Sequence, residues 1–479
     1  MPLSTSHPFS LIIFGASGHL AKLKLYPELY ILELKERLPK DYSIVGFSRT
    51  EMSEDEFKKL VEDSVRENMP AVNEEVLKKF LDHISYHQGQ YSDEADFKSL
   101  NEKLESLEEN SNDLVRLAYF SVPPDAFGNI AHNLCKGGVH NPTIPLGRAK
   151  SRPFRCIVEK PVGHDLKTFQ EIKKGLIGCF KEEEIFLLDH YLGKEAVRNI
   201  FYLRYANPIL EKLLDSKLIH HIEITAFEEA GLDGRAGYFE HTGTFRDMFQ
   251  SHLLMMASLL TMELVEKDES MLKSRLDALK QFYLPPSSDL SDVVMQAQYD
   301  SYKQEDGTAP DSRTNTFCAL KLLTSAGEYQ GVPFYLRSGK RLKKKETRIT
   351  VAFKKGPNGT EGICENCLDI ILQGEAGMKV HLQTKMGGTV PKFRPLILED
   401  PLVCTGDCLP EHSLLILEAI AGSRLWFLTF DEVQAAWRLI DPLQSYLDDP
   451  ETELHLYKAG SGGVEAAEEW VRRDGVRWM

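Results

Sequence analysis

An apolar run that stops at a cluster of polar side chains is the first place in this sequence where chemistry is expected. Ile185–Leu188 is followed by Asp189, His190 and Tyr191, and Lys194 comes shortly after. Four consecutive apolar residues are typical of a strand buried on both faces, and the segment that follows resumes helical spacing. The cluster is therefore predicted to lie at a strand-to-helix turn, where α/β proteins bind ligands.

The residue types in this cluster suit an anion such as a phosphate. A helix N-terminus offers unpaired N–H groups, and His190, Tyr191 and Lys194 add side-chain donors. Asp189 needs another role, because a carboxylate beside an anion is unfavourable unless it is paired, usually with a histidine that it orients. These residues alone leave a second interpretation open, in which Asp189 only caps the helix and His190 and Lys194 are solvated.

A glycine-containing turn near the start of the chain suits a dinucleotide. The apolar run Ser10–Phe14 leads into Gly15–Ala21, with glycines in a G-x-x-G-x-x-A spacing. Glycine lets the backbone turn tightly and approach a pyrophosphate, at which the following helix aims its N-terminus. The spacing also occurs in plain strand-to-helix turns, but its position after a first strand favours dinucleotide binding.

The end of the next predicted strand bears on the choice of coenzyme. Tyr42–Phe47 ends at Ser48 and Arg49. NAD-binding folds place an acidic residue near this position, whereas an arginine suits the 2′-phosphate of NADP, so Arg49 indicates NADP. Lys24 is a second cation for the coenzyme, although a solvated helix lysine is the more ordinary interpretation.

The chain resembles the glucose-6-phosphate dehydrogenase family at several motifs. Residues 189–195 read D-H-Y-L-G-K-E, a family signature, and residues 15–21 are similar to its G-A-S-G-D-L-A coenzyme loop. Residues 159–163 are similar to its E-K-P-F-G motif, and residues 246–254 to its R-D-x-x-Q-N-H-L-L segment. The resemblance runs from about residue 10 to about residue 460.

This resemblance implies oxidation of glucose 6-phosphate to 6-phosphogluconolactone with hydride transfer to NADP⁺, the first step of the oxidative pentose phosphate pathway. Removing the hydroxyl proton as hydride leaves requires a base; His252 is the candidate, Asp189 would hold its ring, and Lys160 would bridge substrate and nicotinamide. The implied substrate-binding residues are His190, Tyr191, Lys194, Glu228, Asp247, Lys340, Lys345 and Gln373. The implied coenzyme-binding residues are Gly15, Ala16, Ser17, Gly18, His19, Leu20, Lys24, Arg49, Pro123 and Lys160.

The candidate base precedes a predicted buried helix, the apolar segment Leu253–Leu260. Asp247 and His252 are five residues apart, which in an α-helix places two side chains about 140° apart, both bordering one cleft. A histidine at such a position is more often a satisfied core residue, and only the resemblance assigns it a catalytic role.

Several positions depart from the family pattern. His19 stands where the family carries Asp, Ser251 replaces Asn, Met255 replaces Gln, and His241 and Thr242 replace an acidic and an aromatic residue. These changes keep two alternatives open: a dehydrogenase of free glucose or another hexose phosphate, and a non-catalytic NADP-binding paralogue. Loss of the catalytic candidates would mark such a paralogue, and all three are present.

The predicted fold class is an α/β Rossmann-like NADP-binding domain, residues 1–200, followed by a larger α+β domain, residues 201–479, with a mostly antiparallel or mixed sheet. Residues 51–112 are expected to form amphipathic surface helices. Residues 351–430 alternate strands and turns, consistent with the sheet that carries the family's dimer contact. A homodimer or homotetramer is therefore expected, and a second, structural NADP site is not predicted.

Composition excludes several other classes. The 479-residue chain carries a net charge of −15, which argues against nucleic-acid and acidic-membrane partners. The absence of a long apolar run or a signal-peptide pattern predicts a cytoplasmic protein. The eight cysteines are expected to be reduced thiols. Zinc would need Cys364 and Cys367 together with Cys404 and Cys408, and the long gap between these pairs disfavours it, so no metal is predicted.

Overall fold

The computed structural model describes residues 7–109, 114–141, 153–232, 234, 236–265, 268–286, 289–355, 366–390, 392–404 and 406–479. The chain divides into two compact units. The first unit spans Met1–Lys194 and Thr405–Phe430, and the second spans Glu195–Cys404 and Asp431–Met479. Among the described residues, none of the helices has the length and apolar character that crossing a membrane requires.

The first unit is built on a parallel sheet of six strands in the order β3-β2-β1-β4-β5-β6. This order, in which the chain reverses direction across the sheet beside β1, is that of Rossmann folds. The strands are β1 (Phe9–Phe14), β2 (Tyr42–Ser48), β3 (Ile84–Gln88), β4 (Val115–Phe120), β5 (Phe154–Glu159) and β6 (Ile185–Leu188). The predicted Rossmann-like fold is confirmed.

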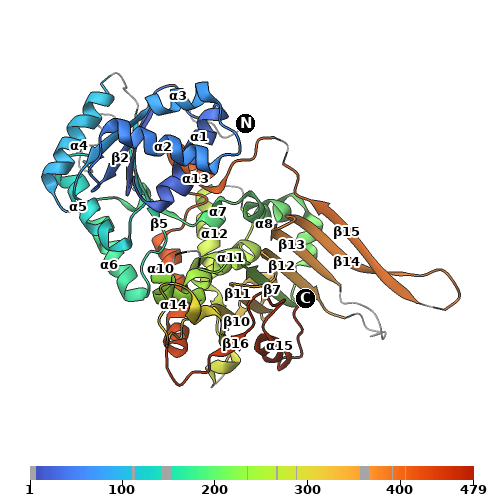
Figure 1. The fold of residues 1–479 in the computed structure, drawn as a ribbon. Coiled ribbons are helices and arrows are strands. Elements are labelled where there is room, and N and C mark those ends of the chain that lie inside the picture. Colours follow the sequence, from blue (N-terminus) through green and yellow to red (C-terminus); the bar gives the residue numbers. More distant parts are fainter. Residues whose placement is uncertain are drawn as a thin grey trace. The chain divides into compact units, whose positions relative to one another are not determined.

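Helices flank this sheet (Figure 1), and polar caps fix where several of them begin. Ser53 forms a capping box with Glu56, and Asn73, Asp93 and Asp165 also accept hydrogen bonds from first-turn N–H groups. The helices are η1 (Ala21–Leu25), α1 (Tyr26–Leu34), α2 (Glu54–Asn68), α3 (Glu74–Asp82), α4 (Glu94–Leu107), η2 (Pro124–Ala126), α5 (Phe127–Lys136), α6 (Leu166–Ile177), η3 (Glu182–Glu184), α7 (His190–Gly193) and α13 (Glu411–Ala421).

Two features of this unit differ from the prediction. Residues 51–112 hold the strand β3 as well as helices, because Ile84 and Tyr86 pair with β2 at the edge of the sheet. Strand β3 has only five residues and one polar end, so its sequence is not distinguishable from the amphipathic helices around it.

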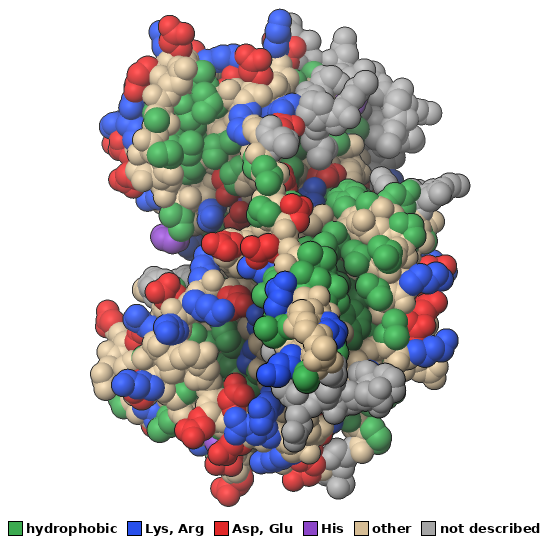
Figure 2. Space-filling model, turned by 90° about the vertical axis from the view of Figure 1, so that its right-hand side faces the viewer, with side chains coloured by type: hydrophobic (Ala, Val, Ile, Leu, Met, Phe, Trp, Pro, Cys, Tyr) green, Lys and Arg blue, Asp and Glu red, His purple; other side chains and the backbone are tan. Residues whose placement is uncertain are grey.

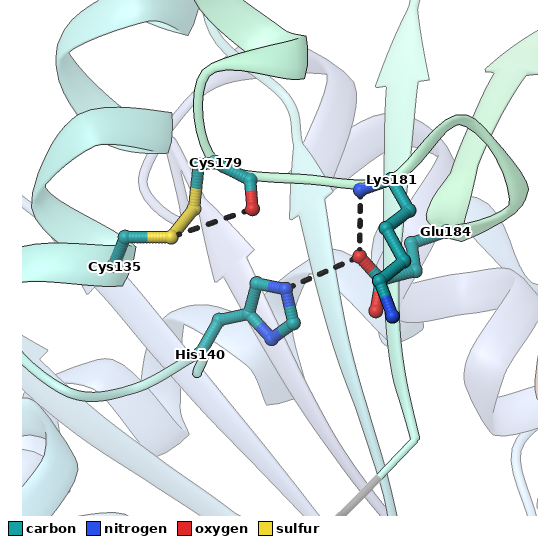
Figure 3. The surroundings of a disulfide bond; sticks show 5 residues. All are labelled: Cys135, His140, Cys179, Lys181 and Glu184. Atoms are coloured by element: carbon teal, nitrogen blue, oxygen red, sulfur yellow. Dashed lines mark hydrogen bonds and ion pairs between the residues drawn. A yellow bond between two sulfur atoms is a disulfide. The ribbon is translucent and has the colours of Figure 1, made fainter. Parts of the chain in front are cut away.

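The second difference is a disulfide bond. Cys135 at the end of α5 and Cys179 after α6 are bonded, with their Cα atoms 5.9 Å apart, because the two helices pack side by side (Figure 3). Cys404 and Cys408 are also disulfide-bonded. The expectation of reduced thiols throughout was therefore wrong, and Cys364 lies outside the described residues.

The second unit is built on a ten-stranded mixed sheet in the order β15-β14-β13-β12-β7-β11-β10-β9-β16, with β8 paired to β10. Strands β7 and β11 are parallel, as are β9 and β16, and the other neighbours are antiparallel, as predicted. The strands are β7 (Ile219–Phe227), β8 (Phe282–Tyr283), β9 (Val294–Tyr299), β10 (Phe317–Thr324), β11 (Pro333–Gly339), β12 (Glu346–Phe353), β13 (Cys367–Gln373), β14 (Gly377–Lys385), β15 (Phe393–Pro401) and β16 (His455–Tyr457).

Helix α11 (Leu254–Thr261) is buried at every residue, as its uniformly apolar sequence predicts. By contrast, the β14–β15 hairpin extends beyond the rest of the sheet and β15 is largely exposed (Figure 1). The other helices of this unit are α8 (Glu195–Ala206), α9 (Pro208–Leu213), α10 (Ala236–Thr244), η4 (Phe245–Leu253), α12 (Asp268–Lys280), η5 (Leu290–Asp292), η6 (Tyr302–Gln304), η7 (Gly327–Tyr329), α14 (Phe430–Leu447) and α15 (Glu465–Arg472).

Candidate active site

The turn after β1 has a backbone geometry that requires glycine at its first position. Gly15 has a φ of 81°, and a Cβ atom there would overlap the carbonyl oxygen of Ser121. Its N–H donates to Phe47 O at 3.0 Å, and the Gly18 N–H donates back to Gly15 O at 2.8 Å. The turn is therefore held tightly between β1, β2 and β4, in the kind of glycine-dependent conformation by which dinucleotide-binding folds approach a pyrophosphate.

The rest of the predicted coenzyme loop leads into η1, a π-helix. Tyr26 OH donates to Ala16 O at 2.6 Å, and the Ser17 hydroxyl lies 3.0 Å from that of Thr50 after β2. His19 is exposed and Leu20 is half-buried. Short π-helical segments are rare and occur frequently at functional sites, so η1 supports a binding role for this turn.

Arg49 follows β2 and is exposed, with its guanidinium carbon 5.6 Å from the centroid of the Tyr91 ring. Burial raises the pKa of the Tyr91 hydroxyl, while Arg49 and the Gly15 backbone act in the opposite direction. Tyr91 thus links the cation to the glycine turn. Sequence reasoning missed Tyr91, because it follows the unrecognised strand β3.

Lys24 is engaged elsewhere in the same unit. Its ammonium nitrogen lies 3.5 Å from Glu411 Oε1 and 4.0 Å from Glu28 Oε1. These contacts favour a structural role for Lys24 over a contact with coenzyme.

The remaining candidates of this unit lie at the same edge of the sheet as the glycine turn. Because β1, β4, β5 and β6 run parallel and in register, their carboxyl ends meet there. Pro123 follows β4 and is exposed, and Lys160 follows β5 and is half-buried. Asp189 follows β6.

The Asp189 segment gathers three cationic or donor side chains. Asp189 is fully buried and caps α7, with Oδ1 accepting from the Tyr191 N–H at 2.9 Å. The Lys194 ammonium lies 3.7 Å above the centroid of the Tyr191 ring, and the His190 ring is 5.0 Å from the same ring. Helix α7 has only four residues, so the positive charge at this turn comes mainly from side chains and not from a helix dipole.

In the second unit, the register of the sheet brings four candidates to one edge. Phe227 at the end of β7 is paired with Gly339 at the end of β11 and with Glu346 at the start of β12. Thr347 is paired in turn with Gln373 at the end of β13. The residues placed at this edge are Glu228, Lys340, Lys345 and Gln373.

An ion pair organises this edge. The buried Lys340 ammonium donates to Glu228 Oε2 and lies 5.1 Å from the centroid of the Phe239 ring. Thr347 Oγ1 donates to Gln373 Oε1 at 3.1 Å, while Lys345 is exposed. The arrangement offers fixed carboxylate and amide oxygens and two ammonium groups, which suits the hydroxyl groups of a sugar.

Asp247 and His252 lie on η4, which is also a π-helix, so the expected 140° separation was wrong. Hydrogen bonds in a π-helix join residues five apart, which places Asp247 and His252 about one turn apart on the same side. His252 is buried and Asp247 is half-buried. The sequence alone does not distinguish a π-helix from an α-helix.

Asn315 connects η4 to the sheet edge. Its Oδ1 accepts from the Phe245 N–H at 3.0 Å, and its backbone oxygen accepts from the Thr244 N–H at 2.9 Å. The next residue, Thr316, accepts from the Lys340 N–H at 2.9 Å. The start of η4 is thus fixed beside the edge that holds Lys340.

A buried cluster in the first unit holds the residue before Lys160, and sequence reasoning missed it. His412 on α13 lies between Glu28 Oε1 at 3.4 Å and Glu159 Oε1 at 3.5 Å. Burial alone would lower the pKa of His412, but the neighbouring carboxylates of Glu159 and Glu28 raise it to about 10. His412 is therefore an imidazolium at neutral pH, and it restrains the end of β5.

The described residues thus form two groups suited to two ligands. In the first unit, the glycine turn with Arg49 fits a nicotinamide dinucleotide, since only glycine at position 15 lets the turn keep its φ of 81° while it packs against the Ser121 carbonyl. In the second unit, the sheet edge with η4 offers a buried histidine, carboxylates and ammonium groups.

Comparison with known proteins covers the whole chain. Residues 12–199 match the model of the glucose-6-phosphate dehydrogenase NAD binding domain, and residues 201–479 match that of the glucose-6-phosphate dehydrogenase C-terminal domain. The chain is 32% identical to glucose-6-phosphate 1-dehydrogenase of Bacillus subtilis, over 98% of this chain and 97% of that one. It is 33% identical to the Schizosaccharomyces pombe enzyme of the same name, over 99% and 95%.

Solved structures agree with these matches. A glucose-6-phosphate dehydrogenase in complex with its substrate glucose-6-phosphate superposes with a TM-score of 0.89 at 28% identity, covering 100% of both chains. Glucose-6-phosphate 1-dehydrogenase from Mycobacterium avium superposes with a TM-score of 0.84 at 27% identity, covering 99% of both chains.

Proposed function

The chain belongs to the glucose-6-phosphate dehydrogenase family, and from this we propose that it oxidises glucose 6-phosphate to 6-phosphogluconolactone with NADP⁺ as hydride acceptor. The observation that carries the proposal is the match of both family domains over nearly the whole chain, together with a complete set of catalytic candidates. Bound NADP⁺ would accept the hydride from the anomeric carbon.

His252 is the proposed base. It would take the proton of the anomeric hydroxyl as the C–H bond breaks, so that the oxygen forms the lactone carbonyl. Its burial on η4 keeps the ring in a fixed place. Asp189, fully buried in the first unit, is proposed to orient the imidazole and stabilise its protonated form.

The phosphate of the substrate is proposed to bind His190, Tyr191 and Lys194. The contact of the Lys194 ammonium with the Tyr191 ring gathers these donors at one turn. Binding energy gained there, away from the reacting carbon, would align the sugar for hydride transfer.

The sugar ring is proposed to bind the edge of the ten-stranded sheet. The Glu228 carboxylate, already fixed by Lys340, would accept hydrogen bonds from ring hydroxyls. Asp247 on η4 would orient the same ring, with Gln373 and Lys345 as further contacts at this edge. Lys160, at the end of β5, would contact both the sugar and the nicotinamide.

NADP is proposed over NAD because of Arg49. Its exposed guanidinium, aligned with Tyr91 beside the glycine turn, suits a 2′-phosphate. The remaining loop residues, Ala16 to Leu20, would surround the pyrophosphate, and an exposed His19 in place of the family's Asp adds no negative charge there.

A homodimer or homotetramer is proposed as the assembled form. Ile397 and Leu398 on β15 are 51% and 53% exposed although adjacent strand residues face opposite sides, so neither face of the β14–β15 hairpin is covered. Figure 2, viewed from the side on which the hairpin projects, shows hydrophobic side chains gathered on that side of the molecule. The cytoplasmic location and the domain boundary at residue 200 stay predictions.

The proposal is tested by measuring coenzyme reduction with glucose 6-phosphate, free glucose and other hexose phosphates, each with NADP⁺ and NAD⁺. Turnover should require the phosphorylated sugar and favour NADP⁺. Equal turnover of free glucose would contradict the proposal that His190, Tyr191 and Lys194 bind the phosphate of the substrate. NADP⁺ binding without turnover of any sugar would identify a non-catalytic paralogue instead.

A further inference from the structure

Three side chains with different metal-binding atoms converge on neighbouring strands of the second unit. Cys367 and Asp369 alternate along β13 and so point to the same face of the sheet. His381 on β14 is the register partner of Cys367, and it therefore points to that face as well. A thiol sulfur, a carboxylate oxygen and an imidazole nitrogen are thus brought together by strand pairing.

The geometry of this Cys–Asp–His cluster is compact. One ligand atom from each side chain lies within 4.8 Å of the other two. His381 Nε2 is 3.0 Å from Asp369 Oδ2, and Thr350 Oγ1 on β12 donates to Asp369 Oδ1 at 2.5 Å. Asp369 is therefore oriented from the side opposite His381, as the carboxylate ligands of metal sites usually are.

The Cys–Asp–His cluster is mostly buried but remains accessible to solvent on one side. Cys367 and Asp369 are 4% and 7% exposed, whereas the His381 side chain is 30% exposed. An ion can reach the cluster past His381. The two buried groups would then hold it in a region where water competes weakly.

We propose that Cys367, Asp369 and His381 bind a divalent transition-metal ion, with zinc as the best match. A mixed sulfur, nitrogen and oxygen ligand set suits Zn²⁺, which is bound at about 2.0–2.3 Å in tetrahedral sites. Closing the cluster to those distances requires small rotamer changes. The three side chains leave one position for water.

Binding would replace the contact between His381 and Asp369 by bonds from both residues to the ion. Cys367 would bind as a thiolate, releasing its proton to solvent, and His381 as a neutral ring. This site differs from the four-cysteine arrangement considered from the sequence, in which Cys404 and Cys408 are already disulfide-bonded. It revises the expectation that the protein holds no metal.

The role we assign to the ion is structural. It would tie β13 to β14, at the base of the hairpin whose outer strand is largely exposed. None of the three ligands belongs to the proposed catalytic set, so the site does not rest on the proposed function.

The test uses the full-length protein after treatment with a chelator. Calorimetric titration with Zn²⁺ should give one site per chain, and titration with Co²⁺ should produce a thiolate-to-metal charge-transfer band. Cys367→Ala should abolish that band, and His381→Asn should weaken Zn²⁺ binding at least ~10-fold. Cys318→Ala and His455→Asn, which alter a buried thiol and a histidine of the same sheet, should leave both signals intact.

Two results would overturn the proposal. One is binding of Co²⁺ by the wild-type protein without a thiolate-to-metal charge-transfer band. This result does not depend on whether any variant folds. The other is Zn²⁺ affinity that stays unchanged in both Cys367→Ala and His381→Asn, since binding would then occur elsewhere. Turnover of glucose 6-phosphate by metal-free Cys367→Ala is expected to equal that of the metal-free wild type, which separates this site from catalysis.

Discussion

The two units build their candidate ligand sites in different ways. In the first unit, the glycine turn and the Asp189–Lys194 segment are each continuous in the sequence, and the glycine turn is held by backbone hydrogen bonds. In the second unit, Glu228, Lys340 and Gln373 come from distant parts of the chain and meet only through strand register. The first site therefore depends on local backbone conformation, and the second depends on the pairing of strands and on the ion pair between Lys340 and Glu228.

The largest effect is expected from a change in local conformation. Gly15→Ala would place a Cβ against the Ser121 carbonyl at a φ of 81°, so the turn must shift away from the pyrophosphate. Loss of two or more charge-assisted hydrogen bonds predicts a fall of at least ~10²-fold in kcat/KM for coenzyme. Gly128→Ala, where a Cβ meets no atom within 4 Å, is the matched control and should be near wild type.

A smaller effect is expected from breaking the ion pair in the second unit. Lys340→Ala removes the partner of Glu228 and should raise KM for the sugar phosphate ~10- to 10²-fold, with coenzyme affinity unchanged. Steady-state kinetics with each substrate varied would show this. The exposed Lys343 provides the control Lys343→Ala; an equal rise in KM there would mean that net charge matters and not the pair.

A smaller effect is expected from Arg49→Ala in the first unit. Because this guanidinium is exposed and screened by salt, its removal should lower kcat/KM for NADP⁺ about 10-fold, with little change for NAD⁺. Arg66→Ala, on the surface of α2, should change neither value. An equal fall in kcat/KM for both coenzymes would show that Arg49 supports the loop and does not bind the 2′-phosphate.

Features that depend on contiguous sequence could be predicted, and features that depend on packing between distant segments could not. The parallel sheet, the glycine turn and the Asp189 segment were predicted, because short apolar runs and contiguous motifs carry them. Strand β3, the π-helix η4 and the Cys135–Cys179 bond were not, since each depends on packing between segments.

The same limit applies to individual site residues. Tyr91 and His412 touch other site residues only after the chain folds, and no local pattern distinguishes them from ordinary core residues. The roles of Glu228, Lys340 and Gln373 came from resemblance to the family, because strand register cannot be read from spacing.

The last effect is one of stability and not of turnover, and it is expected from the buried His412 cluster. Its folded pKa of about 10 lies above the ordinary value of 6.5, so its stabilisation is complete below pH 6.5 and is lost as the pH rises to about 10. The free energy of unfolding of wild type relative to His412→Gln should fall across this window, by at most ~1.4 kcal/mol per pH unit. Urea unfolding at several pH values measures it; a constant difference would contradict the assignment.

The role of His252 as the proposed base is tested by His252→Asn, measured for both turnover and coenzyme binding. We expect kcat with glucose 6-phosphate to fall ~10²- to 10⁴-fold, while the dissociation constant for NADP⁺ stays that of the wild type, since the proposed coenzyme contacts lie in the first unit. Turnover at the wild-type rate would show that His252 is not the base on which the reaction depends.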